Sequence, residues 1–157
     1  MIKTTHGNPR RVRESGNSNR QPREKPIVKE KILIVEDNAQ NMRLLEMTLL
    51  TLGYHILRAT DGETALLKAI REQPDLIIMN IQIPKMDGIE VTRRLRQIPE
   101  CGRVPIIAVT GRTMKGDREQ ILQAGCNVYL PKPINTREFP HLVTRILQPY
   151  PPNDSSV

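Results

Sequence analysis

The chain has 157 residues, of which 26% are charged and 3% aromatic, and this size fits one compact domain with a tail. No apolar stretch approaches the roughly 18 residues that a transmembrane helix needs, and the N-terminus lacks the apolar core of a secretory signal. We therefore expect a cytoplasmic protein with no membrane contact. Its two cysteines, Cys101 and Cys126, belong to no CxxC or Cys/His cluster, which argues against a zinc or disulfide framework.

The formal charge of +7 is concentrated at the N-terminus. Residues 1–29 contain eight basic and two acidic residues, so they carry +6 and leave +1 for the rest of the chain. Because this segment has few apolar residues, it cannot bury enough surface to offset the entropy of ordering, and we expect a basic disordered tail. A solvated extension and a weak electrostatic contact with nucleic acid or anionic lipid both fit it.

From residue 31 the chain alternates between short apolar runs and segments with helical spacing. The run "KILIVE" (31–36) is typical of a strand that is covered on both faces. Residues 39–52 then repeat apolar side chains three or four positions apart, which predicts a helix that Gly53 ends. Three methionines are expected in the core: Met42, Met47 and Met79.

The same alternation continues to residue 148. Five strands and five helices joined by short connections predict a parallel sheet with helices on both faces. Asn135 is expected to cap the last helix, with Pro140 in its first turns, where the loss of an N–H costs least. In chain order, the remaining elements are a strand at 54–59, a helix at 62–73, a strand at 75–80, a helix at 88–98, a strand at 104–110, a helix at 115–125, a strand at 128–131 and a helix at 135–147.

Polar residues stand at the carboxyl ends of four of these strands. Sites in parallel sheets form at that edge, close to the point where the strand order reverses. Two acids after a strand often only cap the next helix, but two acids, an amide, a hydroxyl and a lysine at four strand ends indicate one shared site. In chain order these residues are Glu36, Asp37, Asn80, Thr110 and Lys132.

These motifs resemble the response-regulator receiver domain of two-component signalling. The matching stretches are "ILIVEDN", "PDLIIMNIQIPKMDGIE", "VPIIAVT" and "VYLPKPI", and the resemblance extends over residues 30–148. "KGDREQILQAGCNVYLPKPI" is especially similar to stand-alone receivers of the cell-cycle type. The resemblance implies an α/β fold: a three-layer, doubly wound, five-stranded parallel sheet of the flavodoxin-like type with strand order 2-1-3-4-5. Residues 149–157, rich in Pro and Ser, are then a frayed C-terminal tail.

The resemblance also implies a function. The chain is expected to be a single-domain response regulator of a phosphorelay, a signalling protein and not an enzyme. Its partners are expected to be a histidine kinase or phosphotransfer protein and a downstream target. The target is expected to bind the face formed by the helix at 115–125, the strand at 128–131 and the last helix.

Each matched position takes a role from the resemblance. Asp37 is expected to bind Mg²⁺ directly and Glu36 through water, with the backbone carbonyl of Gln82 as a further ligand. Arg112, two positions after Thr110, fits either a solvated side chain or a residue that tunes access to the phosphate. Thr110 is expected to hydrogen-bond the phosphate, and Lys132 is expected to pair with the phosphate oxygens. The Lys132–Pro133 peptide bond is expected to be cis, which directs the lysine into the site. Tyr129 is expected to be a rotamer switch.

Asn80 is the departure from the family pattern, which has a phosphate-accepting aspartate there. A carboxylate can attack phosphorus, whereas a carboxamide is uncharged and unreactive. The chain as given is therefore expected to be phosphorylation-dead and to bind Mg²⁺ weakly, with the Asn80 oxygen as a poor ligand. A substitution in an otherwise intact site and a natural phosphorylation-independent receiver both explain this residue, and the intact site favours the first.

Two rival functions belong to other classes of protein. The chain could be a nucleic-acid- or partner-binding adaptor in which the basic tail binds and the receiver fold is a platform. An enzyme on a flavodoxin-like fold is disfavoured, because "EDNAQN" stands after the first strand where a glycine-rich phosphate loop would be needed.

Deletion of residues 1–29 tests the expected tail. Since a disordered tail makes no stabilising contact, the melting temperature of the truncated chain should stay nearly unchanged when followed by circular dichroism. A large loss of stability would mean that the tail docks on the domain.

Overall fold

The computed structural model describes residues 29–112 and 114–148 of the chain, and its centre is a five-stranded sheet. All neighbouring strands are parallel, in the order β2-β1-β3-β4-β5, which confirms the order expected from the sequence. The expected tails fall almost entirely outside the described residues, so those expectations stay predictions. The strands are β1 (Lys31–Val35), β2 (His55–Ala59), β3 (Leu76–Asn80), β4 (Ile106–Thr110) and β5 (Val128–Pro131).

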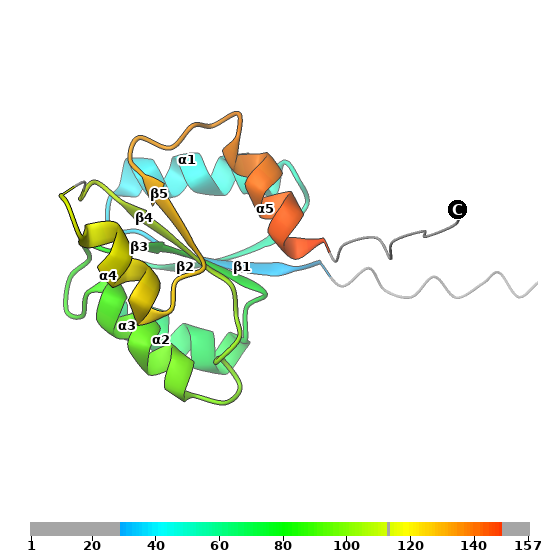
Figure 1. Cartoon of the computed structure of the whole chain (residues 1–157). Coiled ribbons are helices and arrows are strands. Elements are labelled where there is room, and N and C mark those ends of the chain that lie inside the picture. The colour runs from blue at the N-terminus through cyan, green and yellow to red at the C-terminus, as the bar shows by residue number, and fades with distance from the viewer. Residues whose placement is uncertain (1–28, 113, 149–157) are drawn as a thin grey trace, which may run out of the picture.

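Helices cover both faces of the sheet, so the domain has three layers (Figure 1). One face is covered by α1 and α5 and the other by α2, α3 and α4. None of the helices in the described ranges is both long and apolar enough to cross a bilayer. The helices are α1 (Ala39–Leu50), α2 (Gly62–Glu72), α3 (Gly88–Gln97), α4 (Asp117–Ala124) and α5 (Phe139–Leu147).

The core has two halves because side chains alternate between the faces of each strand. Leu33 and Ile77 pack under α2, α3 and α4, whereas their neighbours Ile32 and Ile78 pack under α1 and α5. All residues of β3 and β4 are buried, as expected of central strands covered on both faces. This double coverage is why the strands were recognisable as continuous apolar runs.

The last helix begins later than the sequence indicated. Asn135 was expected to cap it, but α5 starts at Phe139 and its N-cap is Glu138. The Asn135 side chain instead accepts the backbone N–H groups of Arg137 and Glu138, so it caps the turn that leads into the helix. Pro140 lies in the first turn of α5, as expected.

Met47 was expected in the core, and this prediction is wrong: its side chain is 61% exposed. The buried face of α1 is made by Met42, Leu45 and Leu49. Met47 lies two positions beyond Leu45, a rotation of about 200° around the helix, which points it to solvent. Met42 and Met79 are buried, as predicted.

The two cysteines are free and buried. Burial raises the pKa of both thiols, with the charge of Glu100 adding to the effect at Cys101. At neutral pH they are therefore uncharged packing groups.

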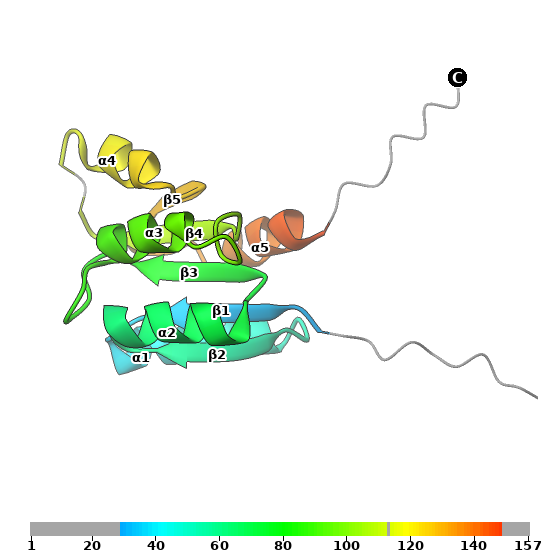
Figure 2. The same cartoon turned by 90° about the horizontal axis from the view of Figure 1, so that it is seen from below.

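The strands place their carboxyl ends at one edge of the sheet. In Figure 2 this edge lies on the left, and the ends of the described chain leave on the right. Asn80 is in register with Val109, so the end of β3 lies beside Thr110, the end of β4.

Candidate functional site

The predicted polar residues meet at this edge of the sheet. Glu36 follows β1 and is 2% exposed, and Asn80 and Thr110 end their strands at 5% and 0% exposure. The Nζ of Lys132, which follows β5, lies 3.2 Å from Oε2 of Glu36. Asn80 donates from Nδ2 to Oε1 of Glu36 at 3.2 Å and to Oδ1 of Asp37 at 3.3 Å. The structure thus brings together the acids, the amide and the lysine from three separate strand ends.

Glu36 is held by the strand that precedes it and by three donors. Its backbone N–H continues the ladder by donating to the carbonyl of Ala59 at 3.0 Å. Its side chain accepts from the Asn38 N–H at 3.1 Å, from Asn80 and from Lys132. A buried carboxylate is costly unless it is paired, and these donors offset the cost.

The acids are not used to cap the following helix. The N-cap of α1 is Asn38, whose Oδ1 accepts the backbone N–H of Asn41 at 3.0 Å. Asp37 is exposed, so its carboxylate is open to solvent on one side and contacts Asn80 on the other. The helix cap therefore leaves both carboxylates to the contacts of the site.

A tightly packed glycine holds the loop between β3 and α3, which contains the exposed Gln82. Gly62 donates its N–H to the carbonyl of Pro84 at 3.1 Å. A Cβ on Gly62 would lie 1.9 Å from the carbonyl oxygen of Met86, so only glycine fits the contact. The first turn of α2 thereby sets the position of the loop.

Asp61 and Lys85 support the same contact. Asp61 caps α2 by accepting the Thr64 N–H at 2.8 Å, and this bond, more than the nearby charge of Lys85, lowers the pKa of Asp61. Nζ of Lys85 lies 3.9 Å from the Asp61 carboxylate, and Lys85 adopts a positive φ of 68°. This ion pair links the loop to α2.

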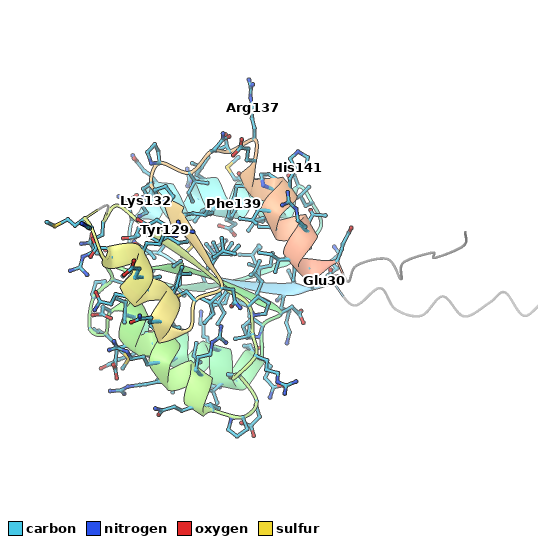
Figure 3. The ribbon with its side chains drawn as sticks, in the orientation of Figure 1. Glu30, Tyr129, Lys132, Arg137, Phe139 and His141 are labelled. Atoms are coloured by element: carbon cyan, nitrogen blue, oxygen red, sulfur yellow. The ribbon has the colours of Figure 1, made fainter. Side chains whose placement is uncertain are left out.

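Thr110 is connected to Tyr129 through one residue of backbone. The N–H of Arg112 donates to Oγ1 of Thr110 at 3.0 Å, and the carbonyl of Arg112 accepts from the Tyr129 hydroxyl at 2.7 Å. Tyr129 lies within β5, and Lys132 directly follows this strand (Figure 3). The peptide bond that follows Lys132 is cis, as expected.

The donor set suits a hard cation. The carboxylates of Glu36 and Asp37 and the amide of Asn80 carry oxygen atoms of the kind that Mg²⁺ prefers, and the contribution of the Gln82 carbonyl stays a prediction. The acids number only two here, and within the described ranges no group of three or more His, Cys, Asp or Glu residues could hold a metal. With Lys132 counted, the formal charge of Glu36, Asp37 and Lys132 is −1.

Three contributions were missed by the sequence reasoning. They are the Asn38 N–H on Glu36, the fit of Gly62 against the loop, and the backbone of Arg112. The sequence "DG" at positions 61–62 signals a helix start, but nothing in it shows that the glycine contacts a segment more than twenty residues away. The backbone of Arg112 has no sequence signal, because any non-proline residue has the same N–H and carbonyl.

Comparison with known proteins gives consistent matches. The response regulator receiver domain family matches residues 32–144. The polar-differentiation response regulators DivK of Brucella anthropi and Brucella ovis are each 44% identical over 108 residues, which cover 69% of this chain and 88% of the relative.

Solved structures agree. The receiver domain of a sensor histidine kinase from Pseudomonas aeruginosa, with a magnesium ion coordinated in its active site cleft, is 40% identical at a TM-score of 0.71, over 76% of this chain and 98% of that one. The chemotaxis protein CheY4 of Vibrio cholerae is 28% identical at a TM-score of 0.71, over 76% and 99%.

The substitution Gly62→Ala tests the loop contact. Alanine is the better helix former, so any destabilisation must come from the clash with the Met86 carbonyl, and we expect a loss of about 1–3 kcal/mol in the free energy of unfolding. Gly111→Ala is the matched control, because a Cβ there meets nothing within 4 Å, and it should change stability by less than about 0.5 kcal/mol. Equal urea midpoints for the two variants would contradict the contact.

Proposed function

Because the chain belongs to the response regulator receiver domain family, we propose that it signals by protein contact and that Asn80 leaves it unable to accept phosphate. The observation that supports this is the position of Asn80. It ends the central strand β3, is buried, and contacts two acids, one of which is paired with Lys132, where a nucleophilic carboxylate would be expected.

The chemistry of the side chain gives the reason. A carboxylate attacks phosphorus with a charged oxygen, and the product is an acyl phosphate. In a carboxamide the nitrogen lone pair is delocalised into the carbonyl, and neither atom is a comparable nucleophile. Asn80 therefore fills the phosphoacceptor position without its reactivity.

Mg²⁺ would be held by Glu36, Asp37 and the carbonyl of Gln82, with the Asn80 oxygen as a weak fourth ligand. The cation, when bound, would neutralise negative charge at the site. With an aspartate at position 80 the site would carry one more negative charge. A unit charge at about 4 Å contributes about 4 kcal/mol at an effective dielectric near 20, partly offset by its own desolvation. We therefore propose weak binding.

Thr110, Lys132 and Tyr129 would carry the signal in a form with an aspartate. Thr110 and Lys132 would contact phosphoryl oxygens through a hydroxyl and an ammonium group. Any movement of Thr110 would be passed to Tyr129 through the backbone of Arg112, since both side chains are hydrogen-bonded to it. That connection supports Tyr129 as the switch residue.

The proposed partners rest on the family and on the position of Tyr129. We propose a histidine kinase or phosphotransfer protein as one partner and a target protein on the face of α4, β5 and α5 as the other, since Tyr129 connects this face to the site. The second candidate function is an adaptor that binds nucleic acid through its basic N-terminal segment. Salt-dependent DNA or RNA binding that is lost on deletion of residues 1–29 would favour the adaptor.

The metal proposal can be tested by titrating the chain with Mg²⁺ and following amide signals by NMR. The signals of Asp37, Asn80 and Gln82 should shift first, because these residues surround the cation, and the dissociation constant should be well above micromolar. A sub-micromolar constant, or shifts confined to a distant surface, would overturn the proposed site.

The substitution Asn80→Asp tests the phosphorylation proposal. This variant restores a carboxylate beside Thr110 and Lys132 with almost no change in shape. With Mg²⁺ and acetyl phosphate it should gain one phosphoryl group, detected by intact mass and labile to hydroxylamine, whereas the unaltered chain should gain none. Without Mg²⁺ the third clustered acid should cost on the order of 1 kcal/mol of stability.

Two outcomes would contradict this reading. A phosphoryl adduct on the Asn80 chain would place the acceptor elsewhere. No adduct on the aspartate variant, with Mg²⁺ demonstrably bound, would mean that the site has lost more than the acceptor carboxylate.

A further inference from the structure

The side-chain amide of Asn80 turns its nitrogen, not its oxygen, toward the acids. Nδ2 lies 3.2 Å from Oε1 of Glu36 and 3.3 Å from Oδ1 of Asp37, so one NH₂ group bridges the two carboxylates. We infer that this amide occupies the role of the divalent cation between Glu36 and Asp37, and that Mg²⁺ must displace it to bind. The inference rests on the proposed function, because it takes these acids to be the metal site.

The orientation of the amide follows from the chemistry of its neighbours. Ionised carboxylates offer only acceptors, whereas the amide has a donor end and an acceptor end. If the amide oxygen faced the acids, three acceptor groups would meet with no proton between them. With the nitrogen inward, each of its two N–H groups has a carboxylate partner, and both bonds are assisted by charge.

The burial of Glu36 makes these bonds necessary. Its side chain is 2% exposed, so water cannot replace a missing donor. Lys132 contacts Oε2, while the Asn38 N–H and Asn80 share Oε1. Asp37 is exposed and can turn to water, but its contact with Asn80 holds it beside Glu36. In the absence of metal, Asn80 and Lys132 together supply hydrogen-bond donors to the acids.

A bound cation would compete with this arrangement. Mg²⁺ takes oxygen ligands, so Asn80 can serve it only by turning its amide over, which ends both hydrogen bonds to the acids. The amide and the cation therefore exclude each other between the carboxylates. The missing negative charge at position 80 lowers the attraction of the site for Mg²⁺. The amide also competes with Mg²⁺ for the carboxylates of Glu36 and Asp37, which an aspartate would not do.

The experiment is a comparison of two chains with and without metal. Melting temperatures of the full chain and of its Asn80→Ala variant are measured in EDTA and in excess Mg²⁺. In EDTA the variant should melt lower by roughly 3–8 °C, because Glu36 and Asp37 lose a shared donor. In Mg²⁺ this gap in melting temperature should narrow. The cation should stabilise the variant, whose acids lack the amide bridge, more than the unaltered chain, whose acids are already bridged.

Asn127→Ala is the matched control. The Asn127 side chain also serves two partners, accepting the Ile106 N–H at 2.8 Å and a guanidinium N–H of Arg96 at 2.9 Å, but it does not contact the acids. Its loss should lower the melting temperature equally with and without Mg²⁺. Three results would overturn the inference: no gap for Asn80→Ala in EDTA, a gap that Mg²⁺ leaves unchanged, or a gap that Mg²⁺ widens, which would make Asn80 a net ligand.

A second measurement uses the unaltered chain and does not depend on the variant folding. The side-chain NH₂ signals of Asn80 should shift over the same range of Mg²⁺ concentration as the backbone signal of Asp37. Shifts of Asp37 with the Asn80 NH₂ signals unmoved would overturn the inference. These results are separate from the phosphorylation of Asn80→Asp, so failure of this inference can be distinguished from failure of the proposed phosphoacceptor position.

Discussion

Glu36 carries a carboxylate that is 2% exposed at the centre of the sheet edge, and such a group costs free energy unless donors surround it. One of its three donors is the N–H of Asn38, just ahead of α1, and the other two come from distant parts of the chain, the end of β3 and the residue after β5. Pairing of this one carboxylate therefore requires that β1, β3 and β5 end at the same edge. The electrostatics of the site and the topology of the sheet impose the same arrangement.

The packing of the helices keeps this edge in place. The apolar side chains of β3 and β4 are buried on both faces, so the strands that end in Asn80 and Thr110 have little freedom to shift. On one side, α2 fixes the following loop through the contact between Gly62 and Met86. On the other, the backbone of Arg112 joins Thr110 to Tyr129, so the polar site has rigid apolar supports and one polar connection toward α4.

Much of this could be predicted from the sequence, because burial on both faces leaves continuous apolar runs and four of the strand ends carry a distinctive polar residue. The runs identified all five strands, and the resemblance to receivers gave their order. Errors arose where side-chain placement depends on more than spacing along the chain. Met47 lies on the outer face of α1, and Asn135 caps a turn that precedes α5. The orientation of the Asn80 amide could not be predicted either, since it depends on charges that only the folded chain brings together.

The ends of the described chain leave the sheet at the edge opposite the acids (Figure 2). Five residues of strand span about 17 Å, so the two edges are separated by roughly that distance. A fluorescent label or a fused protein attached near residue 29 or residue 148 would therefore lie on the opposite side of the domain from Glu36 and Lys132. It would not block a partner that binds at these residues. Attachment to a sensor surface at residue 29 or residue 148 would leave the polar edge facing the solution.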